Sequence, residues 1–373
     1  MASSRFMREA LRLAARAKGN TSPNPLVGAV VVRDDEIIGR GFHARAGTPH
    51  AEVVALNEAG ARARGATLYV TLEPCLHHGA TPPCVEAIAA AGITRVVAAM
   101  EDPDKRMRGA GFAALGARQI ACEIGDGNPE AARLNQAYAH QRATGLPFVT
   151  LKMAQSLDGF AARRSGERTQ LTGAAAARFV RALRYENDAV MIGVDTAIVD
   201  DPALTVRPHK ARAVPYRRVV VDSHGRLPLR SKLVRDRKHA ATIVATTAAM
   251  PSSVRQALTN AGAVVLECRA AQGRVDLMHL LAQLAEQGMI SVLCEGGPTL
   301  AGALLRARCV GKIHWLIAPL FIGSHQIGDA NGAKGVVAGA LDTRLRVEAV
   351  RKLGEDVLLT ATPEDAPQSS LDS

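Results

Sequence analysis

The chain has 373 residues, of which 47% are hydrophobic, and its formal net charge is +11. This length exceeds what one hydrophobic core usually organises, so two domains are expected. It contains no apolar run of about 18 residues, which argues against a membrane-spanning helix. The positive charge predicts an anionic partner, and an aromatic content of only 3% argues against stacking of single-stranded bases. A phosphorylated small molecule fits both observations.

The first part of the chain alternates between helical and strand patterns. Residues 5–14 place apolar side chains on one helical face and basic ones on the other, as in a mitochondrial transit peptide. We favour a first domain helix instead, because the motif-bearing sequence begins near Ser22. Strands are expected at 27–32, 67–72 and 95–99, and helices at 51–63, 84–91 and 128–142. This alternation predicts a sheet with helices on its faces.

Three residues have the chemistry and spacing of a catalytic zinc site. His50 is followed, after a strand, by Cys75 and then by Cys84 at the start of a helix. Catalytic zinc takes three protein ligands and leaves a fourth position to water, and a helix N-terminus favours the thiolate form of cysteine. Glu52, two residues after His50, can face that water as a general acid and base. A closed structural site, with His77 or His78 as fourth ligand, is the alternative.

This pattern resembles the cytidine deaminase-like zinc deaminases. The eight residues between the cysteines, which include the His-His-Gly loop at 77–79, are similar to the riboflavin-pathway deaminase. The resemblance implies a cytidine deaminase-like α/β/α domain over residues 1–146. It implies Zn2+ on His50, Cys75 and Cys84, with Glu52 catalytic and with Asn24 and His77 at the substrate.

Two positions depart from this deaminase pattern. Asp104 replaces an Asn that is frequent in the family, and Ala80 replaces a Lys or Arg near the substrate phosphate. Losing a charge-assisted contact weakens binding by roughly 1.5 to 3 kcal/mol unless another basic residue substitutes. Arg106 and Arg108 are the candidates for that replacement.

A breaker cluster at residues 144–147 marks the expected domain boundary. Beyond it, strands are expected at 148–153, 189–192, 218–222, 242–245, 263–266, 291–294 and 313–317. Helices are expected at 173–184, 252–261, 276–287 and 299–306. We therefore expect a second α/β domain over residues 147–362 and a disordered tail over residues 363–373.

The second domain resembles the riboflavin-pathway reductase, whose fold is similar to dihydrofolate reductase. The likeness rests on the segments at 152–159, 193–196, 200–207, 221–223 and 295–300. A glycine turn at a helix N-terminus, as at 296–298, suits a phosphate. The resemblance implies catalytic Lys152, an NADPH site and a substrate site. The cofactor residues are Ala154, Gln170, Thr196, Asp200, Ser223, Gly297, Pro298 and Thr299, and the substrate residues are Arg168, Arg184, Leu204, Arg207 and Glu295.

Two residues also depart from this reductase pattern. Gln170 stands where the family has a cofactor-stacking Trp, and Arg168 stands where it has a small hydroxyl side chain. Loss of the aromatic contact predicts cofactor binding weaker by about 0.5 to 1.5 kcal/mol. Arg168 is expected to compensate by meeting a phosphate.

Together the two halves predict a bifunctional enzyme of riboflavin biosynthesis that acts on a phosphorylated pyrimidine. We expect a cytoplasmic homo-oligomer with no nucleic-acid or membrane partner, since six cysteines are too sparse for a disulfide scaffold. Two alternatives stay open. One is a nucleic-acid deaminase, and the other is a deaminase whose second domain binds a nucleotide without catalysis.

Overall fold

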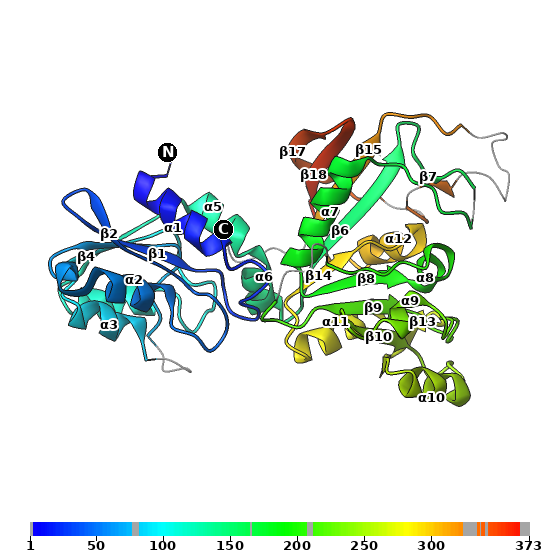
Figure 1. Ribbon diagram of the computed structural model, residues 1–373, viewed down its shortest axis with the longest axis horizontal. Coiled ribbons are helices and arrows are strands. Elements are labelled where there is room, and N and C mark those ends of the chain that lie inside the picture. The colour runs from blue at the N-terminus through cyan, green and yellow to red at the C-terminus, as the bar shows by residue number, and fades with distance from the viewer. Residues whose placement is uncertain are drawn as a thin grey trace. The chain divides into compact units, whose positions relative to one another are not determined.

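The computed structural model describes residues 3–76, 82–164, 166–206, 212–323, 334–335, 337–339 and 342–365. The chain divides into two compact units, Met1–Gly145 and Leu146–Pro367 (Figure 1). Each unit has its own sheet and its own buried apolar core. Within the described residues no helix combines the length and the apolar character needed to cross a membrane.

The first unit is built on a five-stranded sheet in the order β2-β1-β3-β4-β5. β1 pairs antiparallel with β2 and β3, whereas β3, β4 and β5 run parallel. The strands are β1 (Gly28–Arg33), β2 (Glu36–Phe42), β3 (Thr67–Val70), β4 (Arg95–Ala98) and β5 (Ala121–Ile124). The helices are α1 (Arg5–Ala15), α2 (Ala51–Ala59), α3 (Cys84–Ala90), α4 (Ala110–Gly116), α5 (Asn128–Leu134) and α6 (Gln136–Thr144).

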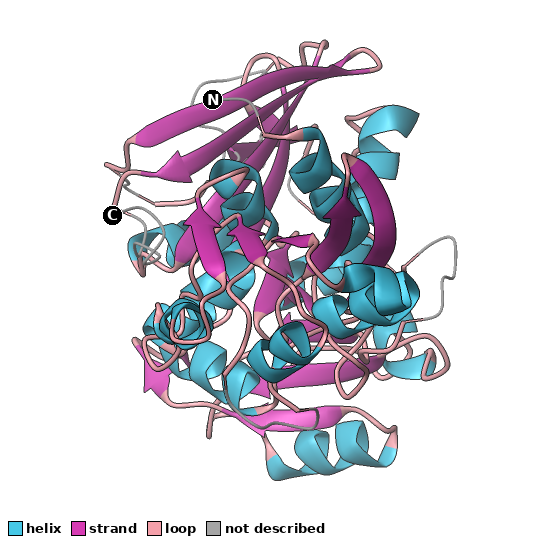
Figure 2. Ribbon diagram, turned by 90° about the vertical axis from the view of Figure 1, so that its left-hand side faces the viewer, coloured by secondary structure: helices cyan, strands magenta, loops and turns pink. Residues whose placement is uncertain are grey.

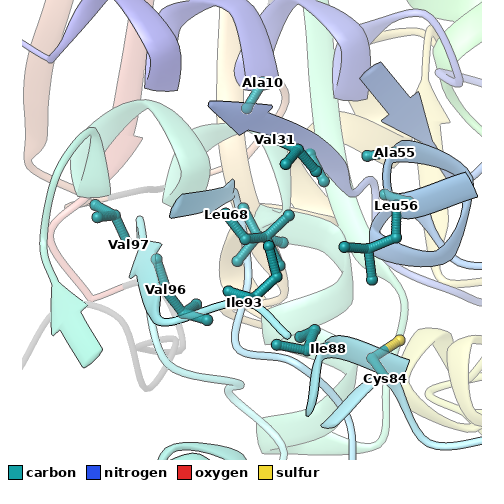
Figure 3. Close-up of a cluster of buried hydrophobic side chains, with 14 of the residues drawn as sticks. Ala10, Val31, Ala55, Leu56, Leu68, Cys84, Ile88, Ile93, Val96 and Val97 are labelled. Carbon is teal, nitrogen blue, oxygen red and sulfur yellow. The ribbon is translucent and has the colours of Figure 1, made fainter. Parts of the chain in front are cut away.

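Helices cover both faces of this sheet. α1 packs against the face of β1 that carries Gly28, and α2 packs against Gly41 on the other face. The core between the sheet and α2 and α3 is formed by aliphatic side chains such as Val31, Leu68 and Ile88 (Figure 3). The amphipathic segment at 5–14 is therefore a domain helix, with Met7 and Ala10 fully buried.

The second unit contains a nine-stranded sheet in the order β11-β10-β9-β8-β14-β6-β15-β18-β17. Pairing is parallel from β11 to β15, and β18 and β17 are antiparallel. Its strands are β6 (Phe148–Ser156), β8 (Ala189–Gly193), β9 (Arg217–Val221), β10 (Ala241–Thr246), β11 (Val264–Glu267), β14 (Ser291–Cys294), β15 (Val310–Ala318), β17 (Leu345–Leu353) and β18 (Asp356–Pro363). Two small ribbons pair β12 (Ala270–Ala271) with β13 (Arg274–Val275), and β7 (Phe160–Ala162) with β16 (Lys334–Gly335).

The helices of the second unit connect these parallel strands. They are α7 (Ala174–Glu186), α8 (Val194–Asp200), α9 (Lys232–Arg235), α10 (Ser252–Asn260), α11 (Leu277–Glu286) and α12 (Pro298–Arg306). Because the strands run parallel, the segments that follow β8, β9, β10 and β14 all begin at one edge of the sheet (Figures 1 and 2). This edge collects the residues that the sequence assigns to the cofactor.

Candidate active sites

The first unit brings the three expected zinc ligands together. His50 is the residue immediately before α2, Cys75 lies in the segment after β3, and Cys84 is the first residue of α3. His50 Nδ1 lies 3.1 Å from Cys84 Sγ and 3.4 Å from Cys75 Sγ, and the three donor atoms lie within 4.8 Å of one another. Tetrahedral zinc would separate a nitrogen and a sulfur ligand by about 3.6 Å. The donor set and its spacing therefore fit a zinc ion.

The electrostatics around the ligands favour thiolate. The backbone N–H of Cys84 at the start of α3 donates to Cys75 Sγ over 3.4 Å, as the helix N-terminus predicts. Hydrogen bonds from Cys84 and His50 lower the pKa of the Cys75 thiol to about 4. Metal-binding cysteine must be deprotonated, so this environment prepares a ligand.

Glu52 lies beside the ligands without belonging to the cluster. It is in the first turn of α2, it is only 4% exposed, and its carboxyl group reaches the Cys84 side chain. Burial and the neighbouring Cys75 charge raise the pKa of Glu52. A carboxyl group with a raised pKa can hold a proton at neutral pH and return it, which is the role of a general acid and base.

Asn24 reaches this centre through His43, a residue that no motif had indicated. Asn24 Nδ2 lies 3.1 Å from His43 Nε2, and His43 Nδ1 lies 3.3 Å from the Pro49 carbonyl oxygen. The carbonyl requires a proton on Nδ1, so Nε2 accepts from the Asn24 amide and leaves its carbonyl oxygen free. The His43 ring also packs edge-on against His50, with ring centroids 5.4 Å apart. Only the buried position of His43 could have suggested this role.

A buried carboxylate holds the loop at 102–111 next to the cysteine turn. Glu73 accepts hydrogen bonds from the backbone N–H groups of Asp102, Gly109 and Gly111, over 3.0, 3.0 and 2.8 Å. A Cβ on Gly111 would lie 2.1 Å from the Pro74 carbonyl oxygen, so glycine is required for this approach. The loop is thereby fixed two residues from the Cys75 ligand.

The expected substitutes for the lost basic residue are partly engaged elsewhere. Arg106 pairs with both carboxylate oxygens of Asp104, over 3.0 and 2.6 Å, and this pair lowers the pKa of Asp104 to about 2. Arg108 is exposed. Arg106 thus neutralises the acid that replaces the family's Asn, and its replacement of the missing basic residue stays a prediction. His77, His78 and Ala80 lie outside the described residues.

In the second unit, a bidentate ion pair joins α7 to the end of β14. Arg184 Nε and Nη2 donate to the two carboxylate oxygens of Glu295 over 2.5 and 2.7 Å. Lys152 on β6 is influenced by both residues: burial lowers its pKa, Glu295 raises it and Arg184 lowers it. Lys152, Arg184 and Glu295, three residues distant in sequence, are therefore brought into one site. Arg207 lies outside the described residues.

The expected cofactor residues gather along the carboxyl ends of the parallel strands. Thr196 in α8 accepts a hydrogen bond from the Gly297 N–H over 3.1 Å, which fixes the turn before Pro298 and Thr299 in α12. A Cβ on Gly296 would lie 3.0 Å from the Gly193 nitrogen. Ala154 lies on β6 at the same sheet edge. The glycine turn thus packs against the end of β8.

The remaining expected residues have different surroundings. Burial raises the pKa of Asp200, whereas the charge of Arg168 lowers it, so the added arginine faces an acid. Gln170 is exposed and donates to the nearby Thr172 carbonyl oxygen over 2.7 Å. Leu204 is buried in the apolar core. Its contact with substrate, and the predicted phosphate contact of Arg168, stay predictions.

Comparison with known proteins agrees with both halves of the chain. Residues 1–100 match the cytidine and deoxycytidylate deaminase zinc-binding region, and residues 147–359 match the RibD C-terminal domain. The riboflavin biosynthesis protein RibD of Escherichia coli K12 is 40% identical over 95% of this chain and 97% of its own length. That of Aquifex aeolicus is 38% identical, over 95% and 96%.

Solved structures give the same result over the whole chain. Acinetobacter baumannii RibD is 38% identical with a TM-score of 0.83, covering 96% of this chain and 98% of that one. A Thermotoga maritima protein named as a diaminohydroxyphosphoribosylaminopyrimidine deaminase and 5-amino-6-(5-phosphoribosylamino)uracil reductase is 30% identical. Its TM-score is 0.81, with coverage of 96% and 97%.

The two folds and their sites define a bifunctional enzyme, a zinc-dependent deaminase joined to an NADPH-dependent reductase. More particularly, the chain belongs to the RibD family of riboflavin biosynthesis. Its cofactors are Zn2+ and NADPH, and it acts on a small molecule. Family membership favours this enzyme over a nucleic-acid deaminase or a deaminase with a non-catalytic second domain.

Proposed function

We propose that the first unit deaminates 2,5-diamino-6-(ribosylamino)-4(3H)-pyrimidinone 5'-phosphate. The second unit then reduces the ribosyl side chain of the product to ribityl with NADPH. The observation that carries the proposal is the cluster of His50, Cys75 and Cys84 donor atoms with buried Glu52 beside it. The activities named for the Thermotoga maritima relative support this choice of substrate.

In the deaminase site, each residue has a separate task. Zinc held by His50, Cys75 and Cys84 supplies a Lewis acid that activates water for attack on the ring carbon bearing the exocyclic amine. Glu52 accepts the proton released from that water and passes it to the departing amine, which leaves as ammonia. The free carbonyl oxygen of Asn24, held by His43, accepts a hydrogen bond from the substrate. We also assign a substrate contact to His77.

In the reductase site, NADPH supplies the hydride and the chain supplies binding and the proton. Arg184 and Arg207 bind the substrate phosphate, because a guanidinium forms paired hydrogen bonds with phosphate oxygens. Lys152, whose pKa is lowered by burial, protonates the opened ribose oxygen as its C1 atom is reduced. The glycine turn before α12 accommodates the cofactor diphosphate against backbone N–H groups.

A substitution of Glu52 tests the deaminase assignment. We expect Glu52→Gln to lower ammonia release by about 10²- to 10⁴-fold, because the amide has no exchangeable carboxyl proton. Zinc content, and NADPH oxidation with pre-deaminated substrate, should stay at the wild-type level. Glu86→Gln is the matched control, since Glu86 is an exposed acid in the first turn of α3. Wild-type ammonia release from zinc-loaded Glu52→Gln would contradict the proposed role.

We further propose that the enzyme is a cytoplasmic homo-oligomer without a nucleic-acid partner. All six cysteines are free thiols, which supports a reducing compartment. β17, an edge strand of the nine-stranded sheet, exposes the apolar side chains of Val347 and Val350 to 54% and 63%. Exposed apolar side chains on an edge strand support pairing with a second copy.

A further inference from the structure

Ser223 is tied to a small hairpin that no sequence pattern predicted. The backbone N–H of Val275 in β13 donates to Ser223 Oγ over 3.0 Å. On its other side, the Ser223 carbonyl oxygen accepts from Thr247 Oγ1 over 2.8 Å. Ser223 follows β9 and Thr247 follows β10, so the hairpin lies at the carboxyl ends of these strands (Figure 1).

One arginine of this region has no counter-charge in the part of the chain that the structure describes. Arg226 pairs with Asp195 over 2.8 Å, and Arg269 pairs with Asp276 over 3.8 Å. Arg274 is exposed and forms no ion pair or side-chain hydrogen bond with any described residue. It directly precedes Val275, so its side chain starts next to the N–H group that binds Ser223. An extended arginine side chain reaches roughly 6 Å at ordinary bond lengths, enough for a ligand beside Ser223.

The order of the strands indicates which end of the cofactor reaches Ser223. The chemistry lies at β6 and β14, where Lys152 and Glu295 are found. The glycine turn after β14 suits the diphosphate. Ser223 follows β9, which lies three strands from β6 in the sheet. At about 4.8 Å per strand this is about 14 Å, a span that an extended dinucleotide covers. The adenosine end therefore falls at Ser223.

We propose that Arg274 and Ser223 bind the 2'-phosphate of NADPH and give the enzyme its preference for NADPH over NADH. The inference rests on the proposed reductase function. Ser223 Oγ already accepts the Val275 N–H, so its hydroxyl proton remains to donate to a phosphate oxygen. Arg274 supplies charge-assisted, bidentate hydrogen bonds. NADH has a hydroxyl group at this position and gains neither interaction with an anion.

The test measures binding directly by calorimetry on the full chain. Arg274→Gln should weaken binding of NADP+ and of 2',5'-ADP by about 10- to 100-fold and leave the Kd for NAD+ unchanged. The decrease of NADP+ affinity with salt should also become less steep. Arg274→Lys keeps the charge and should retain part of the preference. Arg269→Gln is the matched control, because this arginine lies beside the same hairpin but already pairs with Asp276.

Each other outcome has a defined meaning. An unchanged NADP+ affinity in Arg274→Gln, or an equal loss for NAD+ and NADP+, overturns the assignment of Arg274. If that variant keeps its preference while the wild-type chain oxidises NADPH with deaminated substrate, the reductase function stands and only this inference fails. A wild-type chain that neither binds NADP+ nor oxidises NADPH overturns both.

Discussion

His314 is a buried histidine held in its neutral form at the centre of the second unit. Its Nδ1 lies 3.1 Å from Thr360 Oγ1, and its ring packs edge-on against Phe179. Burial, together with the charges of Lys312 and Arg351, lowers the pKa of His314 to about 4. In the unfolded chain a histidine has a pKa of about 6.5. Between these values the unfolded chain binds a proton that the folded chain does not.

The stability of the second unit should therefore fall as the pH falls. We expect His314 to contribute a loss of about 2 kcal/mol in the free energy of unfolding between pH 7 and pH 5. Urea unfolding followed by the fluorescence of Trp315, the only tryptophan, measures this change. His314→Gln should show a smaller loss than the wild type, whereas His224→Gln, at an exposed position, should match the wild type. An identical pH dependence in His314→Gln would show that this residue is not responsible.

At the residue scale, the sequence predicted the groups that share short motifs. His50, Glu52, Cys75 and Cys84 were expected to converge, and their side chains do lie together. His43 and Glu73 were not assigned any role, although one positions Asn24 and the other holds three backbone N–H groups. Their functions depend on contacts between segments distant along the chain. Such contacts leave no periodic or spacing signal.

At the scale of elements, two glycines let helices approach the first sheet closely. A Cβ on Gly28 would lie 2.0 Å from the Ala10 carbonyl oxygen of α1, and a Cβ on Gly41 would lie 2.1 Å from the Ala51 carbonyl oxygen of α2. Both obstacles are backbone atoms, which cannot rotate away as a side chain would. The approach of α2 matters for chemistry because this helix begins directly after His50.

Alanine at Gly28 should therefore push α1 away from the sheet. We expect Gly28→Ala to lower the free energy of unfolding of the first unit by about 1 to 3 kcal/mol, as overpacking does. Gly116→Ala is the contrast, since no atom lies within 4 Å of its Cβ position and its backbone is ordinary helix. That change should stabilise by up to about 1 kcal/mol. Denaturant unfolding monitored by circular dichroism compares the two, and equal effects would refute the steric explanation.

Most long buried elements were predicted, whereas several short or exposed ones were not. β1, β6 and β14 are apolar runs and were found close to their expected bounds. β5 is mostly exposed, and β17 carries charged residues along an edge, so neither has an apolar pattern. The helix expected at 128–142 is interrupted at Asn135, whose side chain instead bonds the backbone of Leu26. Tertiary hydrogen bonding overrides the local helical pattern there.

At the scale of the whole molecule, each unit has its own core and its own set of functional groups. The composition predicted two domains and a phosphorylated ligand, and the motifs predicted both activities. The number of copies in the assembly is not encoded in any of these motifs. It depends on surfaces, and the exposed apolar residues of β17 only become visible once the sheet order is known.

Replacing one of these residues by a charge should weaken self-association. We expect Val350→Lys to shift the mass of the intact chain toward the monomer, because a lysine on the exposed edge opposes pairing with a second copy. Light scattering over a range of concentrations measures the mass. Val264→Lys is the control, since Val264 is 49% exposed on β11, at the opposite edge of the same sheet. A monomeric wild-type chain would refute the proposed homo-oligomer.

The ion pair between Arg184 and Glu295 makes substrate capture an exchange of partners. An arriving phosphate meets a guanidinium that already donates to a carboxylate, so it must displace an internal anion. Inorganic phosphate, which brings no sugar or pyrimidine contacts, gains little from this competition. Once displaced, Glu295 acts on Lys152 without the opposing arginine, and the proton affinity of that amine rises. Arrival of the correct substrate thus charges the proton donor that its reduction requires.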